Sequence, residues 1–131
     1  MIGRPARVKV GALVSDIERT LFRLAIGDDA YIEGILASHA ANLTESCLDA
    51  KTHSLVRLGA LIAADAAAPS YLDAIDSARQ SGTSDEELVG CLIAILPTLG
   101  AVRVTSAAPK LSLALGYDVA AALEESGSPL G

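Results

Sequence analysis

The sequence predicts an all-α protein of about six to seven helices that assembles into oligomers. Hydrophobic residues make up 51% of the 131 residues but aromatic residues only 3%, so the chain is rich in Ala, Leu, Val and Ile. Residues of this kind are typical of packed helices. No segment alternates apolar and polar side chains as a half-buried strand would. A mean hydropathy of +0.43 is high for a small monomer, so we expect apolar surface at subunit interfaces.

Capping residues, helix-ending glycines and the spacing of apolar residues predict where each helix lies along the chain. We expect helices over about residues 15–25, 28–42, 49–65, 70–81, 84–99 and 101–115, and a last short helix over 118–125. Ser15 and Ser84 each open a capping box with a Glu three residues on, and Asp49 and Ser70 begin the third and fourth helices. Glycine is a typical helix stop, and it follows the first, fourth and sixth of these segments.

The helix predicted over 84–99 differs from the others because it is apolar on nearly every side. We therefore expect it to be central in the fold, with Pro97 kinking it near its end. The uncharged stretch from Val89 to Val102 is shorter than the roughly 20 apolar residues that span a bilayer. A cytoplasmic oligomer without membrane contact is the expected setting.

Length and charge narrow the function classes. We expect one domain over 1–131, comprising an arm with two helices (1–47), a core (48–116) and a C-terminal helix with a tail (117–131). A net charge of −6 argues against nucleic acid as a partner, because nucleic acid requires a basic face. The spacing of Cys47 and Cys91 matches no metal or redox motif, so we expect no metal and no cofactor.

Two motifs resemble the carboxymuconolactone decarboxylase and alkylhydroperoxidase-D-like (AhpD-like) superfamily over about residues 48–116. Residues 48–52, Leu-Asp-Ala-Lys-Thr before an apolar helix, are similar to the family's Leu-Asp-Pro-Lys-Thr-Arg. The turn at Gly82 with its acidic cap is similar to the family's Ala-Gly-x-x-x-Glu-Glu. Residues 25–29 and 106–118 also look like an actinobacterial-type branch. The resemblance implies a homotrimer or homohexamer and a small-molecule pocket.

The same resemblance implies a redox site that this chain lacks. In the redox branch, Cys-x-x-Cys is followed by a His one turn on, and a Glu stands on the preceding helix. The matching Cys, Cys and His positions hold Ala67, Ser70 and Ala74 counted back from Gly82, or Ala66, Pro69 and Asp73 counted forward from Thr52. The Glu position holds Ser54. Thiol exchange needs a low-pKa thiolate and a resolving partner, so a peroxidase-type antioxidant is the less favoured alternative.

Polar residues around the emptied motif are the candidates for catalysis. His53 precedes the family's Glu position, and histidine is the residue type best suited to proton transfer near neutral pH, which makes it the candidate base. Its other interpretation is a surface residue paired with Asp49. Tyr71 could orient a ligand oxygen, and Asp73 is the candidate carboxylate, although Asp73 and Asp76 are also typical of a solvated helix face.

Cations on two helices are the candidates for substrate binding. Arg103 and Lys110 lie two turns apart with Ser106 between them, which suits a clamp on a carboxylate, the substrate group of the decarboxylase branch. Arg57, one turn from His53, is the third candidate. The alternative is that all are surface or interface cations.

Two functions stay open at this point. The first is an acid–base enzyme of decarboxylase or isomerase type that acts on a small carboxylate or lactone. The second is a non-catalytic oligomer with a binding or structural role. A concave pocket with converging polar groups would favour the first, and an interior filled with Leu and Ala the second.

Overall fold

A computed structural model describes residues 15–118, 121 and 124–125, and the chain divides into two compact units, Met1–Cys47 and Leu48–Gly131. Within the described residues there are seven α-helices and no strand, which confirms the all-α prediction. The predicted arm over 1–14 lies outside these residues. So does most of the last predicted helix and tail, although Asp118 Oδ1 accepts from Ala121 N at 3.0 Å as its predicted cap.

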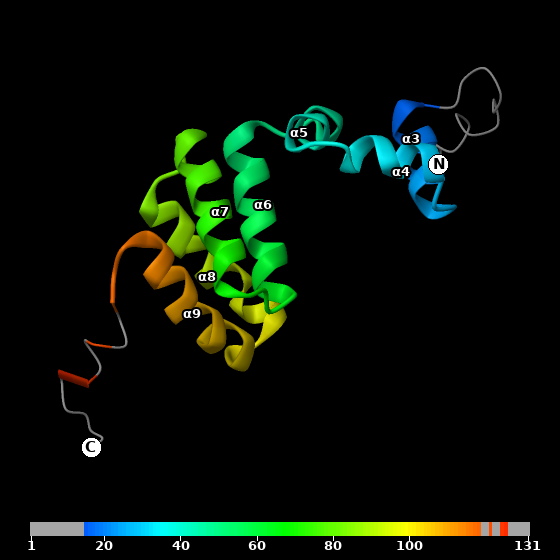
Figure 1. Ribbon diagram of the computed structural model, residues 1–131. Helices are drawn as coiled ribbons and strands as arrows, with labels where there is room; N and C mark the ends of the chain where they lie inside the picture. The colour runs from blue at the N-terminus through cyan, green and yellow to red at the C-terminus, as the bar shows by residue number, and fades with distance from the viewer. Residues whose placement is uncertain (1–14, 119–120, 122–123, 126–131) are drawn as a thin grey trace, which may run out of the picture. The chain divides into compact units, whose positions relative to one another are not determined.

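The N-terminal unit contains α3 (Asp16–Ala25), α4 (Asp29–Leu36) and α5 (His39–Ser46) (Figure 1). Ser15 opens the predicted capping box: its Oγ accepts from Glu18 N at 3.1 Å, while its own N–H donates to Glu18 Oε1 at 3.0 Å. Such a cap contributes roughly 1 kcal/mol to the stability of a helix. Gly27, at φ +64°, ends this helical segment as predicted.

The prediction of one helix over residues 28–42 is wrong, because the structure has two helices there. Ser38 is extended, and its Oγ accepts from Ala41 N at 3.0 Å, so it caps a new helix instead of continuing the old one. A serine hydroxyl competes in this way with the helical hydrogen bonds of its own backbone. His39, expected near the C-terminal end of a helix, is therefore the first residue of α5.

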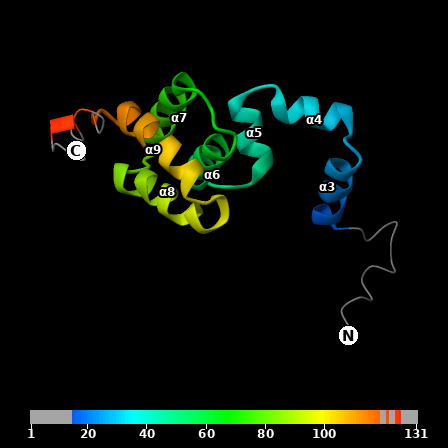
Figure 2. The ribbon, with the colours of Figure 1, turned by 90° about the horizontal axis from the view of Figure 1, so that it is seen from below.

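The C-terminal unit contains α6 (Ala50–Ala63), α7 (Ala68–Gln80), α8 (Asp85–Leu99) and α9 (Ala101–Leu115). Helices α6 and α9 pack on each other and on both remaining helices, whereas α7 and α8 meet where Arg79 Nη2, near the end of α7, donates to Oδ1 of Asp85, the first residue of α8, at 3.0 Å (Figures 1 and 2). The buried core comprises Leu58, Ile62, Tyr71, Ile75, Ala78, Leu88, Ala107, Leu111 and Leu115. Helices α7 and α8 therefore flank a central α6–α9 pair.

The helix starts predicted for this unit are confirmed, except that one of them is displaced by two residues. Asp49 and Ser84 cap α6 and α8 through their side chains. Helix α7 starts at Ala68 and not at Ser70, because Pro69 fits the first turn, where its missing N–H is not needed. Helix α9 continues through Pro109 without a break.

The prediction that the helix over 84–99 would be central is wrong. Only Leu88 of α8 is buried, and Ile93 is 68% exposed. Because α8 packs along α6 and α9 and meets α7 through Asp85 in its first turn, no helix covers its outer side within the described part of the unit. An apolar pattern around the whole helix therefore does not place this helix in the middle of the chain's own core.

Candidate functional site

Asp65 is the meeting point of the cations that the sequence predicts to clamp a carboxylate. It follows α6 in the left-handed conformation, at φ +55°. Arg103 Nη1, Ser106 Oγ and Lys110 Nζ each lie 3.3 Å from one of its carboxylate oxygens. The spacing 103, 106, 110 puts these three side chains on one face of α9. These three side chains therefore converge on a carboxylate of the same chain, and their binding of a substrate carboxylate stays a prediction.

The same contacts fix the α6–α7 turn to α9. Lys110 Nζ also donates to the carbonyl oxygen of Ala66 at 3.0 Å. The hydrogen bond and charge of Lys110, with smaller contributions from Arg103 and Ser106, hold the pKa of Asp65 below its ordinary value of 3.8. Asp65 therefore stays ionised at neutral pH, and the cluster carries a net positive charge.

A cavity of about 300 Å³ lies beside this cluster, lined by Asp65, Leu99, Val102, Arg103 and Ser106. Tyr71 is fully buried, and its hydroxyl has no hydrogen-bond partner among the described residues. Burial raises the pKa of Tyr71, the charge of Asp65 raises it further, and Arg103 opposes the shift. Tyr71 is therefore a neutral phenol whose donor is unused, within electrostatic range of both charged groups.

The other two predicted residues of this region pair with each other. Arg57 Nη2, on α6, donates to Asp73 Oδ2, on α7, at 2.7 Å. Asp73 is exposed, so this ion pair lies at the surface and links two neighbouring helices. Among the described residues, no contact orients the side chain of Arg57 or of Asp73 toward a ligand site.

His53 lies at the other end of α6 from Tyr71. The interpretation of His53 as a surface residue is wrong, because only 8% of it is exposed. The start of α6 meets the end of α7, since Ser54 Oγ lies 2.9 Å from Thr83 Oγ1, so the two helices run antiparallel. Ten residues separate His53 from the end of α6, which is about 15 Å at 1.5 Å per residue. The predicted base and the predicted orienting hydroxyl do not converge.

The two cysteines differ in environment. Cys47 is exposed in the N-terminal unit, whereas Cys91 packs against the core of the C-terminal unit, and neither forms a disulfide. Burial raises the pKa of the Cys91 thiol, and its Sγ lies 3.5 Å from the carbonyl oxygen of Leu55. A thiol of this kind is a small core group and a poor nucleophile.

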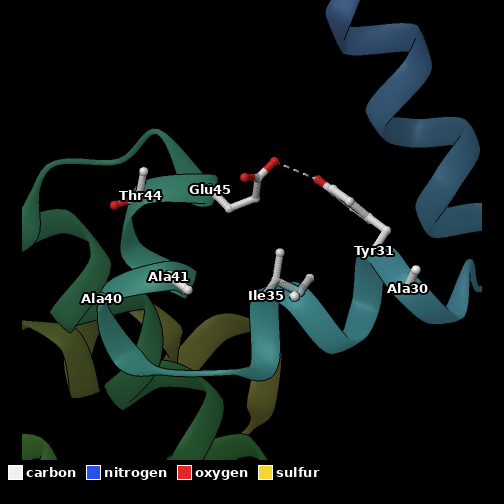
Figure 3. A pocket seen from close by; sticks show the side chains of 8 residues that line it. Ala30, Tyr31, Ile35, Ala40, Ala41, Thr44 and Glu45 are labelled. Atoms are coloured by element: carbon white, nitrogen blue, oxygen red, sulfur yellow. Dashed lines mark hydrogen bonds between the residues drawn. The ribbon is translucent and has the colours of Figure 1, made fainter.

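A hollow of about 500 Å³ in the N-terminal unit is lined mostly by small residues of α4 and α5: Ala30, Tyr31, Gly34, Ile35, Ala40, Ala41, Thr44 and Glu45. Tyr31 OH donates to Glu45 Oε2 at 3.3 Å across it (Figure 3). The Arg23 guanidinium stacks 5.2 Å from the centroid of the Tyr31 ring, which ties α3 to α4. None of the predicted site residues lines this hollow.

Exposed apolar side chains form two stripes with the same spacing. On α3 they are Ile17, Leu21 and Leu24, and on α8 they are Val89, Ile93 and Leu96. The interval i, i+4, i+7 puts each set on one helix face. Helices α3, α4 and α5 contain no buried residue. The sequence shows both stripes, but it does not show that, among the described residues, no helix of the same unit covers them.

Comparisons with protein families, with curated proteins and with solved structures gave no match. The superfamily resemblance of residues 48–116 therefore stays a prediction. Among the described helices, none combines the length and the apolar character that crossing a bilayer requires.

Proposed function

We propose that this protein is a homo-oligomeric helical protein with a binding or scaffold role, in a cytoplasmic setting. The observation that carries the proposal is the apolar surface of α3 and α8. The N-terminal unit does not cover its own large apolar side chains, since none of its three helices has a buried residue. Association with other copies would remove this surface from water.

The energies involved are sufficient for association. Burial of apolar surface stabilises a complex by roughly 25 cal/mol per Å², so several hundred Å² contribute several kcal/mol. Association costs at least ~4 kcal/mol of translational and rotational freedom, so more than one contact surface is needed for a tight assembly. The chain offers two such surfaces, one in each unit.

Light scattering of the full chain tests this proposal. At micromolar concentration we expect a mass of at least twice 13.4 kDa. We expect three or six copies, as the resemblance implies. A stable monomer over the whole micromolar range would contradict the proposal, because it would mean that the stripes of α3 and α8 are covered within one chain.

A second candidate function is supported by the cavity beside Asp65. A small carboxylate in this cavity could compete with Asp65 for Arg103, as an acid–base enzyme for a small carboxylate or lactone would require. Calorimetric titration with succinate tests it. We expect binding that is lost in Arg103→Ala and kept in Arg19→Ala. Absence of binding up to millimolar succinate would contradict carboxylate recognition here.

A further inference from the structure

Asp65 occupies a backbone position that usually belongs to glycine. Its φ of +55° lies in the left-handed region, where a Cβ atom is crowded against the backbone. The chain has glycine in this conformation at the ends of two other helical segments, at Gly82 and Gly116. The backbone of Asp65 is held at the end of α6 by its own N–H, which donates to the carbonyl oxygen of Ile62 at 3.1 Å. Because glycine would fit this turn with less strain, the turn itself does not explain a carboxylate at this position.

The partners of the Asp65 carboxylate hold it loosely. Arg103 Nη1, Ser106 Oγ and Lys110 Nζ lie 3.3 Å from it, whereas charge-assisted hydrogen bonds are usually about 2.8 Å long. Among the described residues, the Arg103 guanidinium meets one carboxylate oxygen and makes no two-point contact. Both Arg103 and Asp65 are partly exposed, and ion pairs in contact with water are weak. A carboxylate that is not tied to the backbone could therefore pair with Arg103 in better geometry than Asp65 does.

Space for such a carboxylate lies beside the cluster. The cavity of about 300 Å³ is lined by Asp65, Arg103 and Ser106 and by the apolar side chains of Leu99 and Val102. This volume is at the small end of the range for ligand pockets. The lining offers a cation and a hydroxyl to a carboxylate and apolar contacts to a short carbon chain. The cavity therefore suits a carboxylate of a few carbon atoms.

We propose that Asp65 is an internal competitor at this cavity, which occupies Arg103 and Ser106 until a small carboxylate displaces it. The turn does not depend on the displaced contacts alone, because Lys110 Nζ also donates to the carbonyl oxygen of Ala66 at 3.0 Å. Such a contact sets the affinity of the cavity, since a ligand binds only at a concentration that is high enough to displace Asp65. The inference rests on the second candidate function above and specifies how that site is regulated.

Calorimetric titration with succinate compares the full-length wild type with two substitutions of Asp65. Asp65→Gly removes the competing group and suits the left-handed backbone, whereas Asp65→Asn removes the charge but keeps an oxygen that can accept from the same donors. A partly exposed ion pair is worth up to about fivefold in an equilibrium constant, and Asp65 makes two such pairs. We therefore expect Asp65→Gly to bind succinate about tenfold more tightly than wild type, and the affinity of Asp65→Asn to lie between the two.

Three controls separate competition at this site from general effects of charge. Asp76→Asn removes the same charge from exposed α7 and should bind succinate as wild type does. Asp65→Gly combined with Arg103→Ala should lose the gain in affinity, because the cation that the ligand requires is then absent. Succinamide, which resembles succinate in shape but has no charge, should bind to none of these proteins.

Each other outcome overturns a defined part of the argument. Equal affinity of wild type, Asp65→Gly and Asp65→Asn contradicts the competitor but leaves carboxylate recognition by the cavity standing. Equal gains in the two variants contradict displacement, because Asp65 would then act through its charge alone. Absence of succinate binding in all of the proteins contradicts both this inference and the second candidate function. If Asp65→Gly loses its helical circular dichroism, Asp65→Asn decides alone: tighter binding than wild type supports the competitor, and equal binding contradicts it.

Discussion

The hydroxyl oxygens of Ser54 and Thr83 lie 2.9 Å apart in the interior of the C-terminal unit. Ser54 Oγ also lies 2.7 Å from the carbonyl oxygen of Lys51, to which it donates. Since a serine hydroxyl has one proton, Thr83 is the donor in the pair. The bond joins the start of α6 to the turn before α8. Ser54 stands at the position that the superfamily resemblance assigns to a Glu, so this position has a structural partner here.

Removing either hydroxyl should destabilise the fold. Ser54→Ala leaves the hydroxyl proton of buried Thr83 without its acceptor, which costs about 1–3 kcal/mol, whereas Thr83→Val removes the same bond but leaves Ser54 donating to Lys51, so its cost should be nearer 1 kcal/mol. The double variant should cost less than the sum of the single ones, because no unpaired group then remains. Urea denaturation measures these values, with Thr105→Ala on the exposed face of α9 as a control within about 0.5 kcal/mol of wild type. Strictly additive losses would mean that the two hydroxyls do not interact.

Lowering the pH should weaken the contact of Asp65 with α9. The pKa of Asp65 is lowered in the folded state, so its stabilising contribution is complete above its ordinary value of 3.8 and is lost as pH falls through the lower folded value. Melting temperatures between pH 6 and pH 3 measure this. The acid-induced decrease should be smaller in Asp65→Asn than in wild type, whereas Asp76→Asn on exposed α7 should follow wild type. Equal pH dependence in all three would contradict the role of Asp65.

The hydroxyl of Tyr71 should contribute nothing to stability. It is buried without a partner among the described residues, so Tyr71→Phe removes a desolvated donor and keeps the packing of the ring. We expect equal or higher stability by urea denaturation for Tyr71→Phe, and a loss of about 3–5 kcal/mol for Tyr71→Ala. A loss above about 1 kcal/mol in Tyr71→Phe would show that the hydroxyl has a partner, such as a bound ligand.

Peroxide reduction should be absent. The Cys91 thiol has a raised pKa because it is buried, and the chain has no Cys-x-x-Cys pair. With cumene hydroperoxide and dithiothreitol, we expect consumption at the rate of the protein-free mixture. Turnover that disappears in Cys47→Ser or Cys91→Ser would contradict this expectation.

Local signals in the sequence predicted most of the fold and less of the site. The capping boxes at Ser15 and Ser84 are short-range features, and both are present in the structure. The break at Ser38 was missed because the apolar spacing continues across it. At the site, the spacing of Arg103, Ser106 and Lys110 predicted a shared helix face. It did not predict Asp65 as their common partner, since a contact between distant segments depends on how α6 packs on α9.

His53 should act through packing and not as a base. It is buried in the first turns of α6, and the hydroxyl of Tyr71 and the cations around Asp65 lie toward the opposite end of that helix. His53→Ala would remove a buried side chain, and large-to-small changes in a core cost about 2–5 kcal/mol when the side chain is fully apolar. For an imidazole that retains a small exposed fraction we expect a smaller loss, about 1–3 kcal/mol.

His39→Ala, on exposed α5, is the matched control and should change stability by no more than about 0.5 kcal/mol. Urea denaturation of the two variants separates the interpretations: a His53→Ala protein that is as stable as wild type but loses ligand binding or turnover would restore His53 as the candidate base, because a structural residue cannot be removed from this position without a loss of stability.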